Sequence, residues 1–317
     1  MVLMTIGLFT LVLAGCTETD ALDGDKSGKG DKPEVVVVLK TLSSPYWKFV
    51  EAGANQAFKD LDVNGKVVGP ASESEVVVQI NMMDDALSGN PGALVVAPTQ
   101  PPTAVPAFKK YKEKGIPVIL LDTDADWSDK TTFIGTDNNT AGKIGGEFLV
   151  SLLSPGDKVA IIGGALGNTA TDERVKGAIE ALEAAGLEVI ANQPADSDRS
   201  KATNVMENIL QNHKDVKGVF AANDDMALGA SRAIESQGLD VKVIGTDGTI
   251  EAVEAVIAGK LAGSVAQNPY EMGYQGVANA LKAINGEEVE ARIDSGAEII
   301  SIENAEERLE FLQSLLK

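Results

Sequence analysis

Short runs of β-branched and other apolar residues alternate with longer amphipathic stretches from Glu34 to the C-terminus. Such runs are typical of strands buried on both faces of a parallel sheet, and the stretches between them of the helices in βαβ units. The runs fall into two series: 35–39, 66–68, 93–96 and 116–121 form the first, and 158–162, 187–190, 218–221, 241–244 and 263–266 form the second. The alternation predicts an α/β architecture that is built twice.

The chain is long enough for two such units. Its 317 residues exceed one typical domain of roughly 100–200 residues, and 44% of them are apolar, which supplies two cores. Three glycines, Gly115, Gly186 and Gly238, each stand just before a predicted strand. Because a helix often ends at a residue in the left-handed conformation, we expect a helix to end at each of them.

Charge and composition exclude several classes of protein. The net charge of −20 and the pI near 4.4 repel phosphate backbones, and no basic face offsets them, so we expect no nucleic acid partner. A single cysteine and a single histidine exclude disulfide frameworks and Cys/His metal sites. Oxygen-ligated metals stay open on composition alone. We predict neither a metal nor a cofactor.

The N-terminal segment 1–16 ends in the chain's only cysteine. The apolar run from Met1 to Leu13 is too short to cross a bilayer, and Leu13-Ala14-Gly15-Cys16 resembles a bacterial lipobox. That resemblance implies cleavage before Cys16 and a diacylglycerol anchor on its thiol. An ordinary secretory signal with a chance cysteine, or a buried N-terminal helix, is the alternative. Residues 17–33 are Asp, Gly, Lys, Ser and Thr with little to bury, and we predict a flexible tether there.

Polar side chains stand immediately after five of the apolar runs. They are Lys40, Asp122, Asn223, Asp247 and Gln267. In open parallel sheets the carboxyl ends of the strands form the ligand crevice, so these groups are expected to converge if the two units face each other. Each Asp or Asn could instead cap the following helix, but Lys40 and Gln267 are poor caps. Taken together, the five favour a binding site.

The predicted site suits neutral polyols. Carboxylates and side-chain amides match vicinal hydroxyls, since they offer paired acceptors or mixed donor and acceptor groups. Tyr46 and Trp47 follow Lys40 closely in a chain with only 4% aromatic residues, and a ring can stack on the C–H face of a sugar. One of the two is expected in the core, and we assign Trp47 to the ligand.

Catalysis finds little support in the sequence. There is no Gly-x-Ser-x-Gly elbow and no phosphate-binding loop of the Gly-x-x-x-x-Gly-Lys-Ser/Thr type, and Gly163–Gly167 lacks dinucleotide spacing. His213 lies in the polar stretch Asn-His-Lys-Asp, as expected for a surface residue. We predict that the protein is not an enzyme.

Several blocks, in order, make the chain resemble a known family. Residues 37–47, Val-Val-Leu-Lys-Thr-Leu-Ser-Ser-Pro-Tyr-Trp, are similar to the first strand, loop and helix of periplasmic sugar-binding proteins of the ribose/allose group. The similarity continues through Thr136-Asp137-Asn138 with Ala141-Gly142, Gly167-Asn168 with Glu173-Arg174, Gln193-Pro194-Ala195-Asp196, Ala222-Asn223-Asp224, Gly245-Thr246-Asp247-Gly248 and Val265-Ala266-Gln267-Asn268-Pro269. The Lys and Trp of the first block look most like the allose-binding members. The resemblance covers nearly everything after the tether.

This resemblance implies a type I periplasmic-binding-protein fold, with two doubly wound parallel-sheet lobes joined by a three-strand hinge. The crossovers are expected near Asp137, Gln267 and Asp294. The first lobe would comprise 34–136 with 268–294, and the second 137–267 with 295–317. By matching positions, the expected ligand contacts are Lys40, Tyr46, Trp47, Asp122, Asn168, Arg174, Asn223, Asp247 and Gln267.

Two departures from the family pattern affect the expected ligand. Ser197 stands where close relatives have an aromatic residue, so one wall of the site is expected to be missing. Thr123 follows Asp122 where ribose and allose binders carry a charged group. The resemblance therefore implies the class of ligand more firmly than its identity.

The implied function is capture of a monosaccharide or related polyol by closure of the two lobes, with delivery to the permease subunits of an ABC transporter. We expect a monomeric extracytoplasmic or periplasmic lipoprotein that touches the membrane only through its anchor. A sugar sensor for chemotaxis or signalling would present the same closed surface and stays an alternative. The effector core of a transcription regulator shares the fold but needs an N-terminal DNA-binding element, where this chain has an apolar segment and an acidic tether. An NAD-linked sugar oxidoreductase lacks its fingerprint here.

Overall fold

A computed structural model describes residues 32–315, which belong to one compact unit of the chain. The predicted signal segment with Cys16, and the predicted tether up to residue 31, lie outside the described residues. No helix within the described part is both long and apolar enough to cross a membrane.

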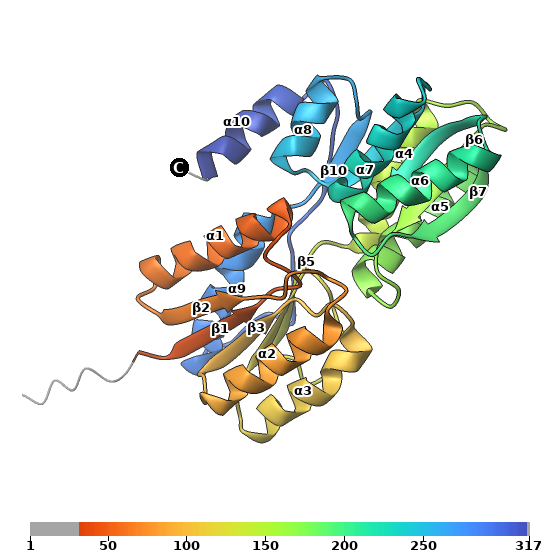
Figure 1. The fold of residues 1–317 in the computed structure, drawn as a ribbon. Coiled ribbons are helices and arrows are strands. Elements are labelled where there is room, and N and C mark those ends of the chain that lie inside the picture. Colours follow the sequence, from red (N-terminus) through yellow and green to blue (C-terminus); the bar gives the residue numbers. More distant parts are fainter. Residues whose placement is uncertain (1–31, 316–317) are drawn as a thin grey trace, which may run out of the picture. The chain divides into compact units, whose positions relative to one another are not determined.

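The first lobe is built on a six-stranded parallel sheet with strand order β11-β5-β4-β3-β1-β2 (Figure 1). Its strands are β1 (Glu34–Val38), β2 (Asn64–Val68), β3 (Ala93–Val96), β4 (Val118–Leu121), β5 (Thr132–Gly135) and β11 (Arg292–Asp294). Its helices are α1 (Pro45–Asp60), α2 (Val76–Ser88), α3 (Pro101–Glu113) and α9 (Pro269–Ile284).

Alternate residues of the strands in this lobe serve two different cores. Val35 and Val37 of β1 face the α1 and α9 side, where they cluster with Val50 and Val277. The intervening Val36 lies on the other side, with residues of α2 and α3 such as Phe108. Because side chains alternate across a strand, a run of consecutive apolar residues fills both layers.

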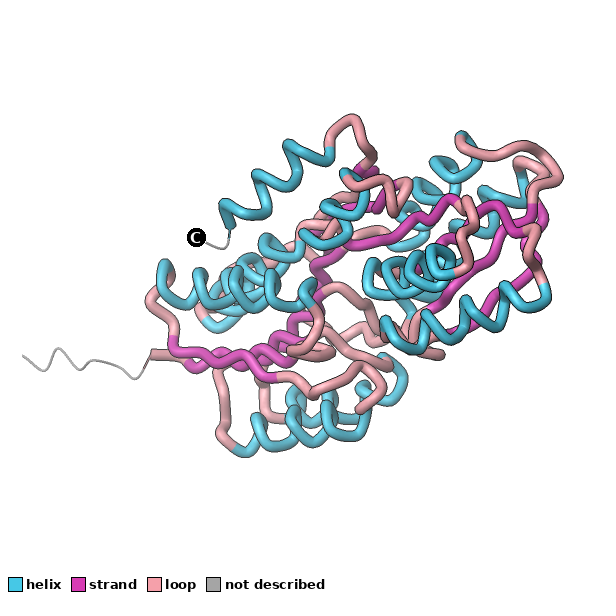
Figure 2. Tube along the Cα trace, turned by 45° about the horizontal axis from the view of Figure 1, so that its top comes forward, coloured by secondary structure: helices cyan, strands magenta, loops and turns pink. Residues whose placement is uncertain are grey.

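The second lobe repeats this plan with one reversed edge strand. Its order is β12-β10-β9-β8-β6-β7, with β12 antiparallel to β10 and every other pair parallel. Its strands are β6 (Lys158–Gly163), β7 (Glu188–Pro194), β8 (Val216–Ala221), β9 (Lys242–Asp247), β10 (Gly263–Ala266) and β12 (Glu298–Ile300). Its helices are α4 (Asn138–Ser151), α5 (Thr169–Ala184), α6 (Arg199–Asn212), α7 (Asp224–Ser236), α8 (Ile250–Ile257) and α10 (Ala305–Leu315). In Figure 2 the strands of each lobe lie between helices.

Local sequence signals set the helix ends. Pro45, Pro101 and Pro269 begin α1, α3 and α9. Proline suits this position because the N–H that it lacks would have no partner within the first turn of the helix. The predicted left-handed glycines are confirmed, with φ of 71° at Gly115 and 79° at Gly186. Gly238 has φ 65° and follows α7 in the same way. Each lets a helix turn into the next strand without a Cβ clash.

The chain passes between the two sheets three times. It crosses from β5 to α4, from β10 to α9, and from β11 to β12. These passages fall beside Asp137, Gln267 and Asp294, where the family resemblance implied them. The fold class expected from the sequence is therefore confirmed, and the exact lobe boundaries stay a prediction.

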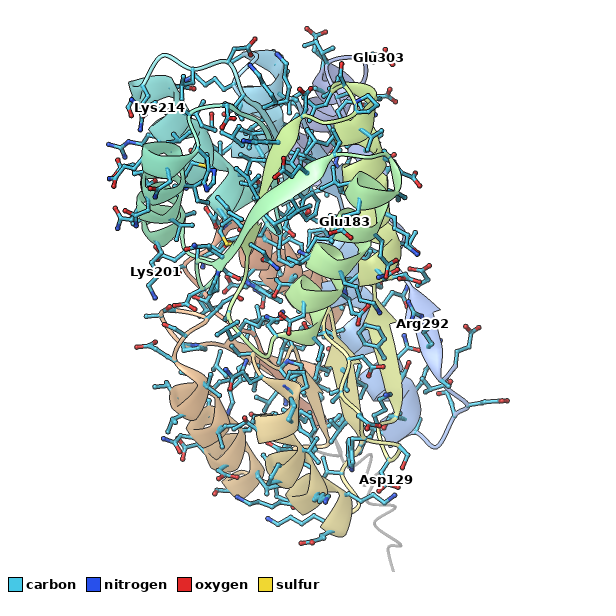
Figure 3. All side chains as sticks on the ribbon, turned by 90° about the vertical axis from the view of Figure 1, so that its right-hand side faces the viewer. Asp129, Glu183, Lys201, Lys214, Arg292 and Glu303 are labelled. Atoms are coloured by element: carbon cyan, nitrogen blue, oxygen red, sulfur yellow. The ribbon has the colours of Figure 1, made fainter. Side chains whose placement is uncertain are left out.

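Charged side chains cover the outside of both lobes. Asp129, Glu183 and Lys214 are exposed and point away from the sheets (Figure 3). A strongly acidic chain folds in this way because its carboxylates keep their hydration. The few charged groups that are buried stand out against this surface.

Candidate functional site

Four of the five polar groups predicted at strand ends come together, beginning with an ion pair. Lys40 follows β1 and Asp122 follows β4, two strands away in the same sheet. Lys40 Nζ donates to Asp122 Oδ1 at 2.7 Å, and both side chains are at least 96% buried. A buried pair of charges is costly to assemble, so its position at the expected ligand edge is a mark of function.

Asp122 is held by further donors. The Tyr46 hydroxyl donates to Asp122 Oδ2 at 3.0 Å, and the Thr123 hydroxyl donates to Oδ1 at 2.8 Å. Burial alone would raise the pKa of Asp122, but the charges of Lys40 and Arg174 outweigh burial and lower it. Asp122 is therefore a carboxylate at neutral pH. Burial beside Asp122 also raises the pKa of Tyr46 well above its usual value, which keeps that hydroxyl a donor.

Arg174, on α5 of the second lobe, connects the two halves of the site. Its Nη1 donates to the backbone oxygen of Ala222 at 2.9 Å and to Asp247 Oδ1 at 3.2 Å, and its Nε donates to Asn138 Oδ1 at 2.8 Å. Its Nη2 lies 3.9 Å from Asp122 Oδ2, across the lobes. Burial would lower the pKa of Arg174, but Asp247 and Asp122 raise it, so the guanidinium stays charged.

Asp247 closes the network on the far side. Gln267 Nε2 donates to Asp247 Oδ1 at 2.8 Å, which is the oxygen that Arg174 also contacts. Burial raises the pKa of Asp247 well above its usual value, and Arg174 only partly offsets this. The six residues Lys40, Tyr46, Asp122, Arg174, Asp247 and Gln267 thus form one continuous polar network, here called the cleft network.

Asn168 and Asn223 are helix caps in the structure. Asn168 Oδ1 accepts from Ala170 N at 3.1 Å at the start of α5, and Asn223 Oδ1 accepts from Met226 N at 2.9 Å at the start of α7. The capping alternative therefore holds for Asn223, whereas neither Asp122 nor Asp247 caps a helix. Capping uses only the oxygen of each amide and leaves its nitrogen free to donate.

Two amide atoms of the predicted site have no partner among the described residues. They are Asn168 Nδ2 and Gln267 Oε1, both fully buried. A buried polar atom without a hydrogen bond costs about 1–3 kcal/mol, so such atoms normally have a ligand or water to satisfy them. One is a donor and the other an acceptor, which is the combination that a hydroxyl complements.

Trp47 and Tyr46 form the aromatic part of the site. Their rings meet edge to face with centroids 5.0 Å apart, and Lys40 Nζ lies 5.4 Å from the centroid of the Trp47 ring. Trp47 Nε1 donates to Glu73 Oε1 at 2.9 Å. Both rings are buried within the described part of the chain. Tyr46 is tied to Asp122, whereas the choice of Trp47 as the stacking ring stays a prediction.

Strained backbone collects at the same place. Among the described residues, six that are not glycine have positive φ, and four of them belong to this region: Asp122 at 60°, Asp196 at 53°, Ser197 at 56° and Asp247 at 128°. Such conformations cost free energy in residues other than glycine and persist mainly where function requires them. They aim the Asp122 and Asp247 carboxylates at positions that a relaxed strand end would not reach.

Glu73 is the residue that sequence reasoning missed. It lies in the loop between β2 and α2, after the strand next to β1, and it contacts Trp47 and faces Lys40. The signal was weak because β2 ends in only two apolar residues, Val67 and Val68, and Gly69-Pro70-Ala71 follow, so no polar residue comes directly after the apolar run.

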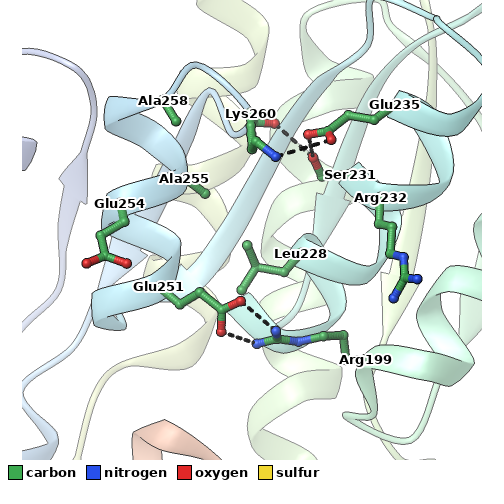
Figure 4. Close-up of a pocket in the computed structure, with 10 residues that line it drawn as sticks. All are labelled: Arg199, Leu228, Ser231, Arg232, Glu235, Glu251, Glu254, Ala255, Ala258 and Lys260. Carbon is green, nitrogen blue, oxygen red and sulfur yellow. Dashed lines mark hydrogen bonds and ion pairs between the residues drawn. The ribbon is translucent and has the colours of Figure 1, made fainter.

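A separate surface pocket shares no residue with the cleft network. It is lined by residues of α6, α7, α8 and the loop after α8, including Arg199, Glu251 and Lys260 (Figure 4). Arg199 and Glu251 pair through two hydrogen bonds of 2.7 Å, and Lys260 pairs with Glu235. With these charges paired to each other, the pocket lacks the buried unpaired polar atoms that mark the cleft network.

Comparison with known proteins places these observations in one family. Residues 35–288 match the periplasmic binding protein domain. The chain is 37% identical over 262 residues to the ribose import binding protein RbsB of Salmonella typhimurium, covering 82% of this chain and 88% of that protein. It is 35% identical over 255 residues to the D-allose-binding periplasmic protein of Escherichia coli, covering 77% and 82%.

A solved structure agrees with the fold. The carbohydrate transporter solute binding protein of Agrobacterium radiobacter, in complex with D-arabinose, superposes with a TM-score of 0.84 at 31% identity and covers 91% of this chain and 100% of its own. The chain therefore belongs to the periplasmic binding protein family, with the two parallel α/β lobes of the type I fold.

Proposed function

We propose that this protein binds a monosaccharide or related polyol of the ribose or allose kind between its lobes and delivers it to an ABC transporter. The cleft network carries the proposal: Lys40 and Asp122 come from the first lobe, and Arg174 and Asp247 from the second. Neither lobe contains the whole set. A ligand that contacts both lobes binds the closed arrangement better than the open one, and so shifts the population toward closure.

The donor and acceptor pattern favours a neutral polyhydroxylated ligand. The Asp122 and Asp247 carboxylates accept from pairs of hydroxyls, while Lys40 and Arg174 donate to hydroxyl and ring oxygens. Asn168 Nδ2 and Gln267 Oε1 supply one more donor and one more acceptor. An anionic ligand is disfavoured because the two cations of the network already face two carboxylates.

The relatives support transport rather than chemistry. Two of them carry ribose import and D-allose binding in their names, and the solved neighbour holds D-arabinose. The cleft network contains no nucleophile paired with a base of the kind that catalysis needs. We propose accordingly that the ligand leaves unchanged and that no cofactor takes part.

We propose further that the mature protein is a monomer tethered outside the cytoplasm through a lipid on Cys16. The lipobox-like Leu-Ala-Gly-Cys and the polar stretch after it support this location. The acidic surface supports the absence of nucleic acid partners. Permease subunits of the transporter are the expected partners of the closed form.

Calorimetric titration of the purified protein against a panel of aldoses, ketoses and inositols tests the sugar assignment. One or a few members are expected to bind tightly and to raise the melting temperature, as a ligand of the native state does. A panel that produces neither heat nor a thermal shift at any member removes the assignment. Recovery of the bound sugar unchanged, by chromatography after heat release, checks that no bond is broken.

A further inference from the structure

The loop after β2 holds Glu73 in a fixed place. Ser43 Oγ donates to the backbone oxygen of Ala71 at 2.9 Å, and Glu75 Oε2 accepts from Ala71 N at 2.9 Å and from Ser72 N at 3.2 Å. These bonds tie the loop to the start of α2 and to the loop after β1. Glu73 is therefore presented at the strand edge that carries the cleft network, although it follows an edge strand that sequence patterns mark weakly.

Glu73 faces residues of both lobes. It accepts from Trp47 Nε1 at 2.9 Å. Burial raises the pKa of Glu73, and the nearby charge of Lys40 and hydrogen bonding from Trp47 and Ser197 act in the opposite direction. Lys40 and Trp47 belong to the first lobe, and Ser197 to the second. Glu73 thus lies between Trp47 and the loop that the family resemblance predicts to carry an aromatic wall.

Ser197 leaves room for this carboxylate. Asp196 and Ser197 are consecutive non-glycine residues in the left-handed conformation, with φ of 53° and 56°. Two strained residues in succession are costly, so the direction in which the loop points is imposed by its surroundings. A serine at this position reaches less far than an aromatic residue, and it offers a hydroxyl toward Glu73 instead of a ring.

The acceptor capacity of Glu73 is only partly used. A carboxylate can accept about four hydrogen bonds; Trp47 provides one and the Ser197 hydroxyl a second, so about half of the capacity stays open. Glu73 takes part in none of the ion pairs found among the described residues, whereas Asp122 pairs with Lys40 and Asp247 with Arg174. Around the cleft, three carboxyl groups therefore lie near two cations, and Glu73 is the one outside the ion pairs. A ligand group that donates a hydrogen bond complements the extra carboxylate.

We propose that Glu73 is a specificity-determining residue that faces the ligand and accepts a hydrogen bond from one of its hydroxyl or ammonium groups. This inference rests on the proposed function, because it assigns one more contact to the same site. It makes the site selective for a sugar, polyol or amino sugar that places a donor beside Trp47. A ligand with hydrogen or an acceptor at that position leaves the carboxylate unpaired, which is a large cost at a partly buried site.

Titration of three proteins against the tightest sugar of the panel tests this inference. They are wild type, Glu73→Gln and Glu73→Ala, with Glu51→Gln on α1 as the matched control for loss of a carboxylate outside the cleft. Monodeoxy analogues and amino analogues of the sugar complete the set. Glu73→Ala is expected to raise the Kd for the parent sugar about 10- to 100-fold. Thermal melting of each protein checks that it is folded. If Glu73→Ala melts early, the comparison uses Glu73→Gln, whose side chain has nearly the same shape as that of Glu73.

One deoxy analogue identifies the contact. The analogue that lacks the donor beside Glu73 is expected to bind wild type and Glu73→Ala with equal affinity. Every other analogue should still bind Glu73→Ala more weakly than it binds wild type. If wild type binds an amino analogue more tightly than the parent sugar, the preferred donor is an ammonium group. If wild type binds it more weakly than the parent sugar, the preferred donor is a hydroxyl. Either result supports the assignment.

The opposite role is distinguishable. If Glu73 acts only by positioning Trp47, its substitution weakens every analogue by the same factor, and that loss disappears in the Trp47→Phe background; this pattern overturns the inference. Unchanged affinities in both Glu73 variants overturn it as well, while leaving the proposed function intact. A wild-type protein that binds no member of the panel overturns both together.

Discussion

Ser44, at the end of the loop after β1, donates its hydroxyl to Asp225 Oδ2 on α7 at 2.9 Å, and so joins the two lobes outside the cleft network. Asp225 is held from the other side by Arg199, whose Nη2 donates to Asp225 Oδ1 at 2.7 Å. Arg199 is fixed in turn by its pair with Glu251. Further bonds cross between the lobes, among them those from Gln100 Nε2 to the backbone oxygen of Leu166 and from the Thr169 hydroxyl to that of Asp124.

Removing the Ser44 hydroxyl should weaken ligand binding without weakening the fold. Because the bond exists only while the lobes touch, Ser44→Ala is expected to raise Kd about five- to tenfold, as for one hydrogen bond to a charged group, mainly through faster dissociation. Stopped-flow release and calorimetry measure this. Ser236→Ala, whose hydroxyl bonds within α7, is the control. Equal Kd in Ser44→Ala and wild type would show that the bond does not stabilise closure.

Asp247 is expected to be indispensable for binding. It accepts from both Arg174 and Gln267, so its loss removes a ligand contact and leaves a buried guanidinium short of a partner. Asp247→Ala should abolish binding, by more than about 100-fold in Kd. Circular dichroism should show an intact fold. Asp240, an exposed residue that forms an ion pair with Lys242, is changed to Asn as the control. Near wild-type affinity in Asp247→Ala would remove this residue from the site.

Gly142 positions Arg174 by close helix packing. A Cβ at Gly142 of α4 would lie 2.0 Å from the backbone oxygen of Arg174 on α5, so α4 and α5 can be this close only without that side chain. Gly142→Ala should therefore displace α5, cost about 1–3 kcal/mol of unfolding free energy, and weaken binding through Arg174. Gly163→Ala, where the nearest atoms are 3.7 Å away, should affect neither. Chemical denaturation and titration of both variants decide whether stability and affinity fall together.

The pH dependence of stability should contain a contribution from Asp224. This buried carboxyl accepts from Thr249 and Ser264, and burial raises its pKa to about 7. The folded state therefore holds a proton that the unfolded chain, with a pKa near 3.8, has released. The stability that Asp224 confers is complete below its pKa in the unfolded chain, and it is lost as pH rises through its pKa in the folded state.

Replacing Asp224 by Asn isolates that contribution. The neighbouring charges on Asp225 and Asp247 and the guanidinium of Arg308 stay in place in the variant. The difference in unfolding free energy between the variant and wild type should grow in favour of Asn from pH 4 to pH 7. Urea melts at half-unit intervals measure it. A difference independent of pH would mean that Asp224 is ionised throughout.

The proposed anchor predicts a chemical modification at Cys16. Mass spectrometry of the membrane fraction should find this residue acylated at a new N-terminus. Cys16→Ser should move the protein from the membrane to the soluble fraction, since the acyl chains are the only anchor proposed. Sugar affinity should not change, because the described site begins at Lys40. An unmodified wild-type chain in the soluble fraction would contradict the anchor.

Much of the architecture could be predicted because buried parallel strands are continuous apolar runs. The runs at 93–96 and 263–266 match β3 and β10 residue for residue. The short strands β5, β11 and β12 escaped, since Thr-Phe-Ile-Gly, Arg-Ile-Asp and Glu-Ile-Ile contain too few consecutive apolar residues to mark a strand. Their pairing depends on neighbouring strands rather than on their own sequence.

The site was predictable to the extent that polar residues directly follow strands. Asp122 and Gln267 do so, Lys40 comes two residues after β1, and Asp247 is the last residue of β9; the structure links all four. Glu73 could not be found in this way, because its position depends on how a loop folds back onto Trp47. The direction of the Asp122 carboxylate likewise depends on a positive φ that no sequence pattern encodes.

The late return of α9 and β11 to the first lobe bears on how the chain is made. Gly53 of α1 and Gly273 of α9 let those helices meet so closely that a Cβ at either would strike the backbone of the other helix. β11 likewise completes the sheet edge beside β5. A nascent chain cannot supply these partners until residue 294 has emerged, by which point nearly all of the second lobe has been synthesised. The first lobe therefore completes its packing only after most of the second lobe has been made, so the two lobes finish folding at nearly the same time rather than one after the other.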